Sequence, residues 1–255
     1  MFKSSVNLYF SSELDSKSKI DLIKEVGYDE FYTGIYKKNE TMDIISQIKY
    51  AKSLGLGITM VHCLYDEKNL NDFWKDGDIG DEIEKSYEMQ INKIGEYTNN
   101  FVVHLSGSDE VVHTPIGLQR INRLLKTCEK YNINLAVENL YTENEIRYIF
   151  NNLSHPLLKI CFDCGHKNFL TKNFDLLGEY GRYVSVLHIH DNNGITDEHK
   201  IIGTGNINLK QLAKQLSKYN LIYSAEIKVI DKGLDLKEVL QSNKDALFNL
   251  YKLGN

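Results

Sequence analysis

The chain alternates between short runs of consecutive apolar residues and longer runs in which apolar residues recur every three or four positions. The first pattern predicts buried β-strands, and the second predicts helices with one apolar face. The apolar runs expected to be strands are Val6–Phe10, Phe31–Tyr36, Gly57–Tyr65, Phe101–Leu105, Asn132–Leu140, Leu158–Asp163, Val184–His190 and Ile222–Val229. A helical pattern follows each of them, so the repeating unit is one strand and one helix.

Local signals mark where some of the helices begin. Thr114 and Pro115 are a favourable N-cap and first position for the helix after the fourth strand. Thr142, with Glu145 three residues later, predicts a capping box at the start of the next helix. Asn173–Tyr180 is expected to form a short helix after the sixth strand.

Eight strands alternating with helices over 255 residues predict a (β/α)8 TIM barrel that fills one domain, residues 1–255. A doubly wound open sheet is the alternative. A dinucleotide-binding fold of that kind would carry a GxGxxG motif after its first strand, and this chain does not. No change in composition marks a second domain.

Charge and composition narrow the location and the partners. The formal net charge of −5 and the pI of about 5.9 argue against nucleic-acid binding by overall charge, although a local basic groove is compatible with them. The N-terminal stretch lacks the apolar core of a signal peptide, and no run approaches the ~20 apolar residues of a membrane span. We therefore expect a cytoplasmic protein without a membrane partner.

The four cysteines show no disulfide framework. Cys161 and Cys164 have CxxC spacing, but they lie in and beside an expected strand, and no second pair accompanies them. We expect buried free thiols in a reducing compartment rather than a thiolate zinc site.

Histidines and carboxylates gather at the carboxyl ends of the expected strands. In a barrel these ends converge on one face, where the active site lies. The metal-competent residues there are His62, His104, Glu138, Asp163, His166, His188, Asp197, His199 and Glu226. Imidazole and carboxylate donors without convergent thiolates favour Zn, Mn, Co or Fe. Glu138 and Glu226 each follow an apolar run, at a depth where an unpaired carboxylate would be costly, so each is expected to have a cationic partner.

Three further histidines, His113, His155 and His190, are not expected to belong to the site. His113 and His155 lie in expected loops or helix boundaries. The direction of His190 relative to His188 depends on whether the strand stays regular that far, and the pattern leaves this open.

Several motifs together resemble a known family. They are VENL at Glu138, FDCGH from Asp163 to His166, LHIHDN at His188, DEHKIIGTGNI with Asp197 and His199, and AEI at Glu226. Their order and spacing resemble the xylose-isomerase-like barrels, which include sugar and sugar-phosphate isomerases and epimerases as well as the endonuclease IV group. The resemblance runs over roughly residues 57 to 230 and implies the same TIM-barrel fold.

The isomerase and epimerase members imply one use of these residues. The resemblance assigns one divalent ion (Mn, Zn, Co or Mg) to Glu138, Asp163, His188 and Glu226. It also implies that Glu138 and Glu226 flank the substrate and move protons, while His166 and His62 contact it. These implied roles are chemically reasonable, because two carboxylates beside a metal-polarised carbonyl can remove and return a proton on the adjacent carbon.

The endonuclease IV group implies another use, in which three zinc ions cleave abasic DNA. The resemblance then adds His62, His104, His166, Asp197 and His199 as ligands. Most loops after the strands are short, however, and Asp66–Gly80 is acidic where a DNA-binding loop would carry Lys or Arg. Lys37 and Lys38 are the obvious basic pair, which fits a solvated turn or a contact with a substrate phosphate.

We therefore expect a metal-dependent isomerase or epimerase acting on a sugar or sugar phosphate. Zinc-dependent hydrolysis of abasic DNA is the alternative. A lyase, a dehydratase or a binding barrel without turnover is also compatible with the motifs. Whether the protein forms a homo-oligomer stays open.

Overall fold

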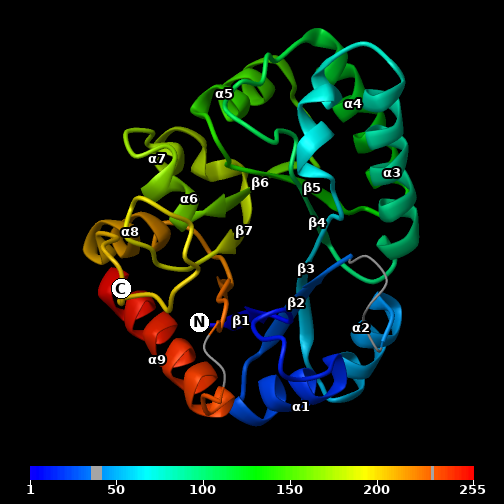
Figure 1. The fold of residues 1–255 in the computed structure, drawn as a ribbon. Coiled ribbons are helices and arrows are strands. Elements are labelled where there is room, and N and C mark those ends of the chain that lie inside the picture. The colour runs from blue at the N-terminus through cyan, green and yellow to red at the C-terminus, as the bar shows by residue number, and fades with distance from the viewer. Residues whose placement is uncertain (36–41, 231–232) are drawn as a thin grey trace.

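The computed structural model describes residues 1–35, 42–230 and 233–255, and these residues form a (β/α)8 barrel (Figure 1). The strands are β1 (Ser4–Asn7), β2 (Glu30–Gly34), β3 (Gly57–His62), β4 (Asn100–Val103), β5 (Asn134–Glu138), β6 (Leu158–Asp163), β7 (Val184–His188) and β8 (Tyr223–Ala225). All pair in parallel, in the order β7-β6-β5-β4-β3-β2-β1-β8. A parallel bridge between Ile189 and Ala225 joins the two ends of this order. The predicted fold class is confirmed.

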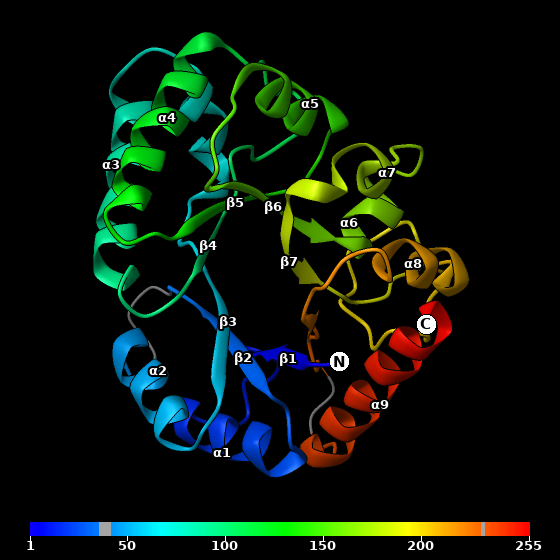
Figure 2. The same cartoon turned by 180° about the vertical axis from the view of Figure 1, so that it is seen from behind.

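Helices form the outer layer around these strands. They are α1 (Ser16–Val26), α2 (Ile44–Ser53), the 3-10 helix η1 (Glu67–Trp74), α3 (Asp78–Ile94), α4 (Pro115–Glu129), α5 (Glu143–Asn152), α6 (Cys164–Phe169), α7 (Leu176–Tyr180), the 3-10 helix η2 (Gly181–Tyr183), α8 (Leu209–Leu216) and α9 (Leu236–Gly254). The last helix, α9, packs beside both α8 and α1, so the first and last helices adjoin in the outer ring (Figure 2).

The strands are shorter at their carboxyl ends than the apolar runs predict. β3 ends at His62, β7 ends at His188 and β8 ends at Ala225. Beyond these points the chain leaves the ladder, so the polar residues that follow turn onto the rim of the barrel. The predicted strand end at Tyr36, together with Lys37 and Lys38, lies outside the described residues.

Both predicted helix starts are placed correctly, and Thr114 and Pro115 are the N-cap and first residue of α4 as predicted, but the capping box predicted for α5 is wrong. Thr114 and Thr142 stand at the N-cap positions of α4 and α5, and neither side chain makes a capping hydrogen bond. The Thr114 hydroxyl instead donates to the backbone carbonyl of Trp74. The Glu145 carboxylate lies 3.5 Å from Nε2 of His113 rather than reaching back to the N-cap. Partners from distant segments have replaced the local ones.

The region after β3 is also more ordered than a polar loop. It contains η1, because Leu70, Phe73 and Trp74 are buried against the barrel. In addition, α6 begins directly after β6, and the expected short helix near Asn173 is α7.

Two apolar layers hold the barrel together. Successive strand residues point alternately into the barrel and toward the helices. The inward layer beneath the rim consists of Tyr32, Met60, Val102, Ala136, Cys161 and Val186, all buried. The larger outer layer lies between strands and helices. The inner layer forms a floor, so side chains at the strand ends face a cavity closed from below.

The predicted state of the cysteines is confirmed, since all four are free and buried. Among the described residues, no helix has the length and apolar character needed to cross a membrane.

Candidate metal centre and active site

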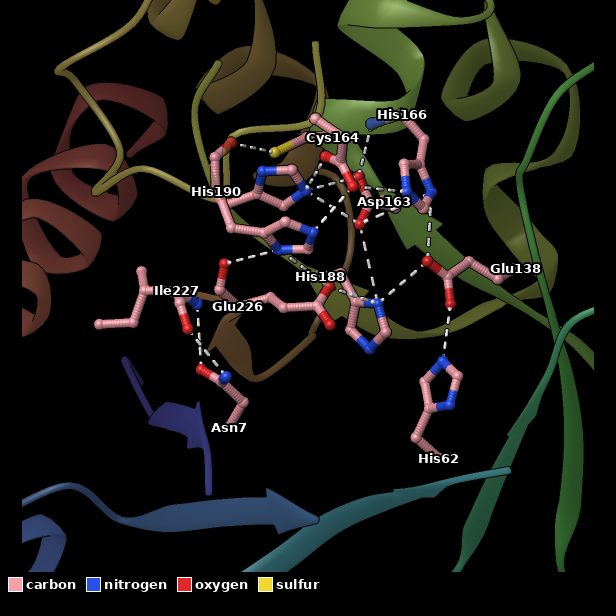
Figure 3. Close-up of polar contacts among 12 residues, drawn as sticks. Asn7, His62, Glu138, Asp163, Cys164, His166, His188, His190, Glu226 and Ile227 are labelled. Carbon is pink, nitrogen blue, oxygen red and sulfur yellow. Dashed lines mark hydrogen bonds and ion pairs between the residues drawn. The ribbon is translucent and has the colours of Figure 1, made fainter. Parts of the chain in front are cut away.

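Strand ends bring four donor residues together. Glu138, Asp163 and His188 are the last residues of β5, β6 and β7, and Glu226 follows β8 directly. Parallel strands of a barrel end on the same rim, so these residues converge although they are far apart in sequence. Their ligand atoms all lie within 4.8 Å of one another, and all four residues are buried. Figure 3 shows the three carboxylates turned toward His188.

The Glu138 carboxylate is at the centre of this group. Its Oε2 lies 3.0 Å from Nε2 of His104 and 3.3 Å from Nε2 of His62. Its Oε1 lies 3.2 Å from Nδ1 of both His166 and His188. One carboxylate therefore faces imidazoles on two sides, with a different oxygen turned to each pair.

Glu226 and Asp163 complete the cluster from the other side. Nδ1 of His188 lies 3.0 Å from Oε2 of Glu226 and 3.7 Å from Oδ2 of Asp163. The other Glu226 oxygen accepts a hydrogen bond from the Tyr9 hydroxyl. The Asp163 carboxylate also accepts the backbone N–H of His166 at 2.7 Å, so it caps α6 and holds that histidine over the site.

The loop between β7 and α8 supplies the remaining predicted donors. Oδ2 of Asp197 lies 2.8 Å from Nε2 of His199 and 3.5 Å from Nε2 of His166. The loop folds around the buried Asp191 carboxylate, which accepts the backbone N–H groups of Asn192, Gly203 and Ile207. A Cβ at Gly205 would lie 2.3 Å from Oδ1 of Asp191, so only glycine fits there. The glycine-punctuated segment thus turns Asp197 and His199 toward the rim.

All the predicted site residues therefore lie in one connected cluster, and the structure adds His190, which the sequence left as background. His190 is fully buried, and its Nε2 lies 3.1 Å from Oδ1 of Asp163. Its ring stacks on that of His199, with centroids 4.2 Å apart. Because β7 ends at His188, strand alternation no longer decides where His190 points. Two histidines separated by one residue directly after a buried strand are the signal that could have identified it.

The two other background histidines lie outside this cluster. His155 contacts the exposed Glu129 at 3.0 Å. His113 pairs with Glu145 beneath α4 and α5, against the edge of Trp74.

The charges of the cluster fit a bound cation. Among the described residues, the ion-pair partners of Glu138, Asp163 and Glu226 are all histidines, with no Lys or Arg within 4.0 Å. Burial opposes ionisation of Glu138, yet the imidazoles of His188 and His104 hold its pKa well below the usual range. Burial likewise opposes protonation of His62, but its hydrogen bonds with Cys63 and Glu138 raise its pKa to about 10.

Metal binding to such a site would replace these imidazole protons. Carboxylate and imidazole donors suit Zn, Mn, Co or Fe. Three further groups of three donors accompany the central one among the described residues. Two consist of imidazoles and carboxylates, namely His62–His104–Glu138 and His190–Asp197–His199. The third, Glu138–Cys161–His188, includes a thiol, so the expectation that no thiolate converges on the site is wrong for Cys161.

A cavity of about 1140 Å³ opens above the cluster. Glu138, Glu226, His62 and His166 are among the residues that line it. A small molecule in this cavity would therefore contact both buried glutamates directly.

The sequence model of the xylose isomerase-like TIM barrel family matches residues 20–246 of this chain. The chain belongs to that family, which confirms the resemblance carried by its motifs.

Curated relatives match over part of their length. Two uncharacterized proteins of Methanocaldococcus jannaschii are 33% and 30% identical to this chain, over 138 and 134 residues. The first match covers 49% of this chain and 53% of the relative, and the second covers 48% and 46%. The chain thus spans about half the length of the curated relatives it matches.

Solved structures share the fold over the whole chain. A D-tagatose 3-epimerase-like protein is 22% identical, with a TM-score of 0.79, and the match covers 100% of this chain and 98% of that one. D-allulose 3-epimerase from Methylomonas sp., solved with D-allulose, is 13% identical, with a TM-score of 0.79 and coverage of 98% and 97%. The IolI protein, solved with a zinc atom, is 15% identical, with a TM-score of 0.78 and coverage of 98% of each chain.

Proposed function

We propose that this protein is a divalent-metal-dependent isomerase or epimerase of a sugar or sugar phosphate. The observation that carries the proposal is the group of Glu138, Asp163, His188 and Glu226, in which both glutamates also line the cavity. The family supports it, as does the likeness of the fold to a D-tagatose 3-epimerase-like protein and to D-allulose 3-epimerase.

Glu138, Asp163, His188 and Glu226 would hold the cation. When bound there, it would supply Lewis-acid polarisation of a substrate carbonyl and hydroxyl. The pKa values of Glu138 and Glu226 are lowered despite burial, because His188 and other imidazoles face both carboxylates. Both groups are therefore ionised in the metal-free protein, and the ionised carboxylate is the form that would accept a proton from the carbon next to the carbonyl. In an epimerase, one glutamate removes this proton and the other returns one from the opposite face of the substrate.

The neighbouring histidines would orient the substrate. His166 is fixed by its backbone hydrogen bond to Asp163, and its ring lines the cavity. His62 lines the cavity beside Glu138. Their rings would hydrogen-bond substrate oxygens on either side of Glu138.

The test measures metal content and proton exchange on the same preparation. Protein purified without chelator is analysed by elemental mass spectrometry, and then D- and L-2-ketohexoses and their phosphates are followed by NMR in deuterated water. We expect about one divalent ion per chain and deuterium incorporation next to the carbonyl of at least one sugar. Failure of every sugar to exchange with metal-loaded protein would contradict the proposal.

Substitution of one glutamate tests its role in proton transfer. Glu138→Gln keeps the shape of the side chain and removes its basic oxygen, so we expect an intact fold and a loss of exchange of about 100-fold or more. His155→Gln is the matched control. It changes a histidine that contacts the exposed Glu129 outside the cluster, and it should keep the wild-type exchange rate. A near-wild-type rate in Glu138→Gln would remove this residue from catalysis.

Zinc-dependent phosphodiester hydrolysis is the second candidate, and one observation favours it. Two groups of imidazole and carboxylate donors flank the central one. His62–His104–Glu138 shares Glu138 with it, and His190–Asp197–His199 contacts its Asp163 through His190. About three zinc ions per chain, together with cleavage of an abasic duplex, would support this alternative. About one ion per chain without cleavage would support the isomerase or epimerase.

A further inference from the structure

The cavity lining combines two kinds of residue. It contains glutamates and histidines of the metal-competent cluster. It also contains apolar residues, of which we define Leu64, Tyr65, Val229, Ile230, Leu234 and Val239 as the apolar wall. The wall is built by the segments after β3 and β8 and by α9.

The apolar wall begins directly beside the reactive groups. The Tyr65 ring centroid lies 4.3 Å from that of His104 and 6.1 Å from that of His62. A ligand whose polar end contacts the cluster would therefore meet apolar side chains as soon as it extends along the cavity.

The wall leaves apolar surface uncovered in the described part of the chain. Ile230 is 74% exposed and Leu234 is 47% exposed. A single exposed apolar residue is ordinary, whereas several around one cavity mark a binding surface. Two lysines also line the cavity, and Lys200 is paired with Glu198 at 2.6 Å. Lys228, next to Val229 in the chain, is the other lysine among the described lining residues.

We propose that the natural substrate carries an apolar substituent, alkyl or aryl, at its end away from the reacting carbonyl. A free monosaccharide bears hydroxyl groups along its chain and would leave the wall uncovered. The cavity volume of about 1140 Å³ also exceeds the roughly 300–1000 Å³ that is common for drug-sized ligands. The inference rests on the proposed function, because it takes the metal-competent cluster as the end where the sugar reacts.

The probes are the 2-ketohexoses and their 6-O-benzyl ethers, which differ only by an aromatic group at the far end. Solvent deuterium exchange gives kcat/KM for each member of a pair. Saturation-transfer NMR gives binding whether or not exchange occurs. With wild-type protein we expect a preference for the benzyl ether of about tenfold, equivalent to about 1.4 kcal/mol.

A double variant and a matched control locate the preference. Ile230→Asp with Leu234→Asp places charge on the wall and should reduce the benzyl preference to about twofold or less. Val112→Asp with Ile79→Asp is the control, because these residues are 72% and 48% exposed and lie outside the cavity lining. The control changes the net charge by the same amount but leaves the apolar wall intact, so the tenfold preference should remain.

The outcomes separate this inference from the proposed function. Exchange on free ketoses without a benzyl preference would overturn the inference and leave the function in place. A preference that survives in Ile230→Asp/Leu234→Asp would also overturn it. If no ketose exchanges, the function fails. The inference then holds only if the benzyl ethers bind to wild type and not to the wall variant, and it falls if they bind to neither or to both.

Discussion

Gly165 and His190 form a close steric pair beneath the proposed metal site, and substitution of the glycine tests how much the site depends on it. A Cβ at position 165 would lie 2.0 Å from Cε1 and 2.4 Å from Nε2 of His190. The imidazole is fully buried between Asp163 and His199, so it has no free space on the opposite side. Gly165→Ala must therefore displace His190 and disturb its contact with the Asp163 carboxylate.

The size of the effect follows from two opposing terms. Alanine in place of glycine normally stabilises a helix by about 0.5–1 kcal/mol, and Gly165 lies in α6. Overpacking of a closed core costs about 1–3 kcal/mol. The difference between these terms spans about 0 to 2.5 kcal/mol, and we expect Gly165→Ala to lower the free energy of unfolding by about 1 kcal/mol, near the middle of that range. In a His190→Ala background the ring is gone, so the same methyl group should be neutral or stabilising.

Urea unfolding of wild type, both single variants and the double variant measures the coupling. We expect the double variant to be more stable than the sum of the singles by about 1–3 kcal/mol. Gly165→Ala combined with His155→Ala is the control and should be additive. Effects that add within about 0.5 kcal/mol for Gly165 and His190 would refute the steric argument.

Metal affinity distinguishes the effect of packing around His190 from the effect of its hydrogen bond to Asp163. Loss of an imidazole that orients a metal-binding carboxylate typically weakens binding about 10–100-fold. Zinc titration should show this loss in both single variants. The double variant should be at least as stable as His190→Ala without recovering affinity, because the steric clash is removed while the imidazole is still missing.

Three further predictions use the same protein. In metal-free protein, hydrogen bonds with Cys63 and Glu138 raise the pKa of His62 from 6.5 to about 10. The protonated His62 therefore contributes fully to the free energy of unfolding below pH 6.5, and this contribution is lost as the pH rises toward 10. Urea unfolding across this range should show the decline, and an equally steep decline in His62→Gln would disprove the assignment. Arg120→Met should lower the free energy of unfolding by about 3–5 kcal/mol, because this buried guanidinium donates to backbone carbonyls near η1. Arg123→Met, which removes a half-exposed ion pair, is its control and should cost less than about 1 kcal/mol. His104→Gln should leave the metal count per chain unchanged if one ion is bound, and elemental analysis showing one ion fewer would favour the three-metal alternative.

The sequence was sufficient to predict the fold and the position of the donors along it. Each apolar run became a strand, and Asp163, His188 and Glu138 stand at strand ends, where the alternating pattern placed them. Parallel strands with helical crossovers force their carboxyl ends onto one rim, so knowledge of the strands was enough to predict which residues meet. The roles of these residues in metal binding and catalysis are still predictions.

Contacts between distant segments were not accessible from the sequence. The Thr114 hydroxyl donates to the carbonyl of Trp74, and Glu145 faces His113, so neither helix start has a local side-chain cap. His190 was missed for a similar reason, because its direction depends on where the ladder of β7 ends and on the space left by Gly165. Local patterns specify the elements, whereas these partners exist only after the elements pack.

The two carboxylate oxygens of Glu138 face different pairs of histidines, and this difference bears on the chemistry of the site. Oε1 faces His166 and His188, on the side of Asp163 and Glu226, whereas Oε2 faces His62 and His104. A cation held only on the Oε1 side leaves Oε2 beside two imidazoles that can orient a substrate oxygen, which is what proton transfer requires. Cations on both sides would instead engage both oxygens and leave Glu138 no free basic atom. Under either proposed function, the number of metal ions bound would therefore decide between proton transfer and hydrolysis through the state of this one carboxylate.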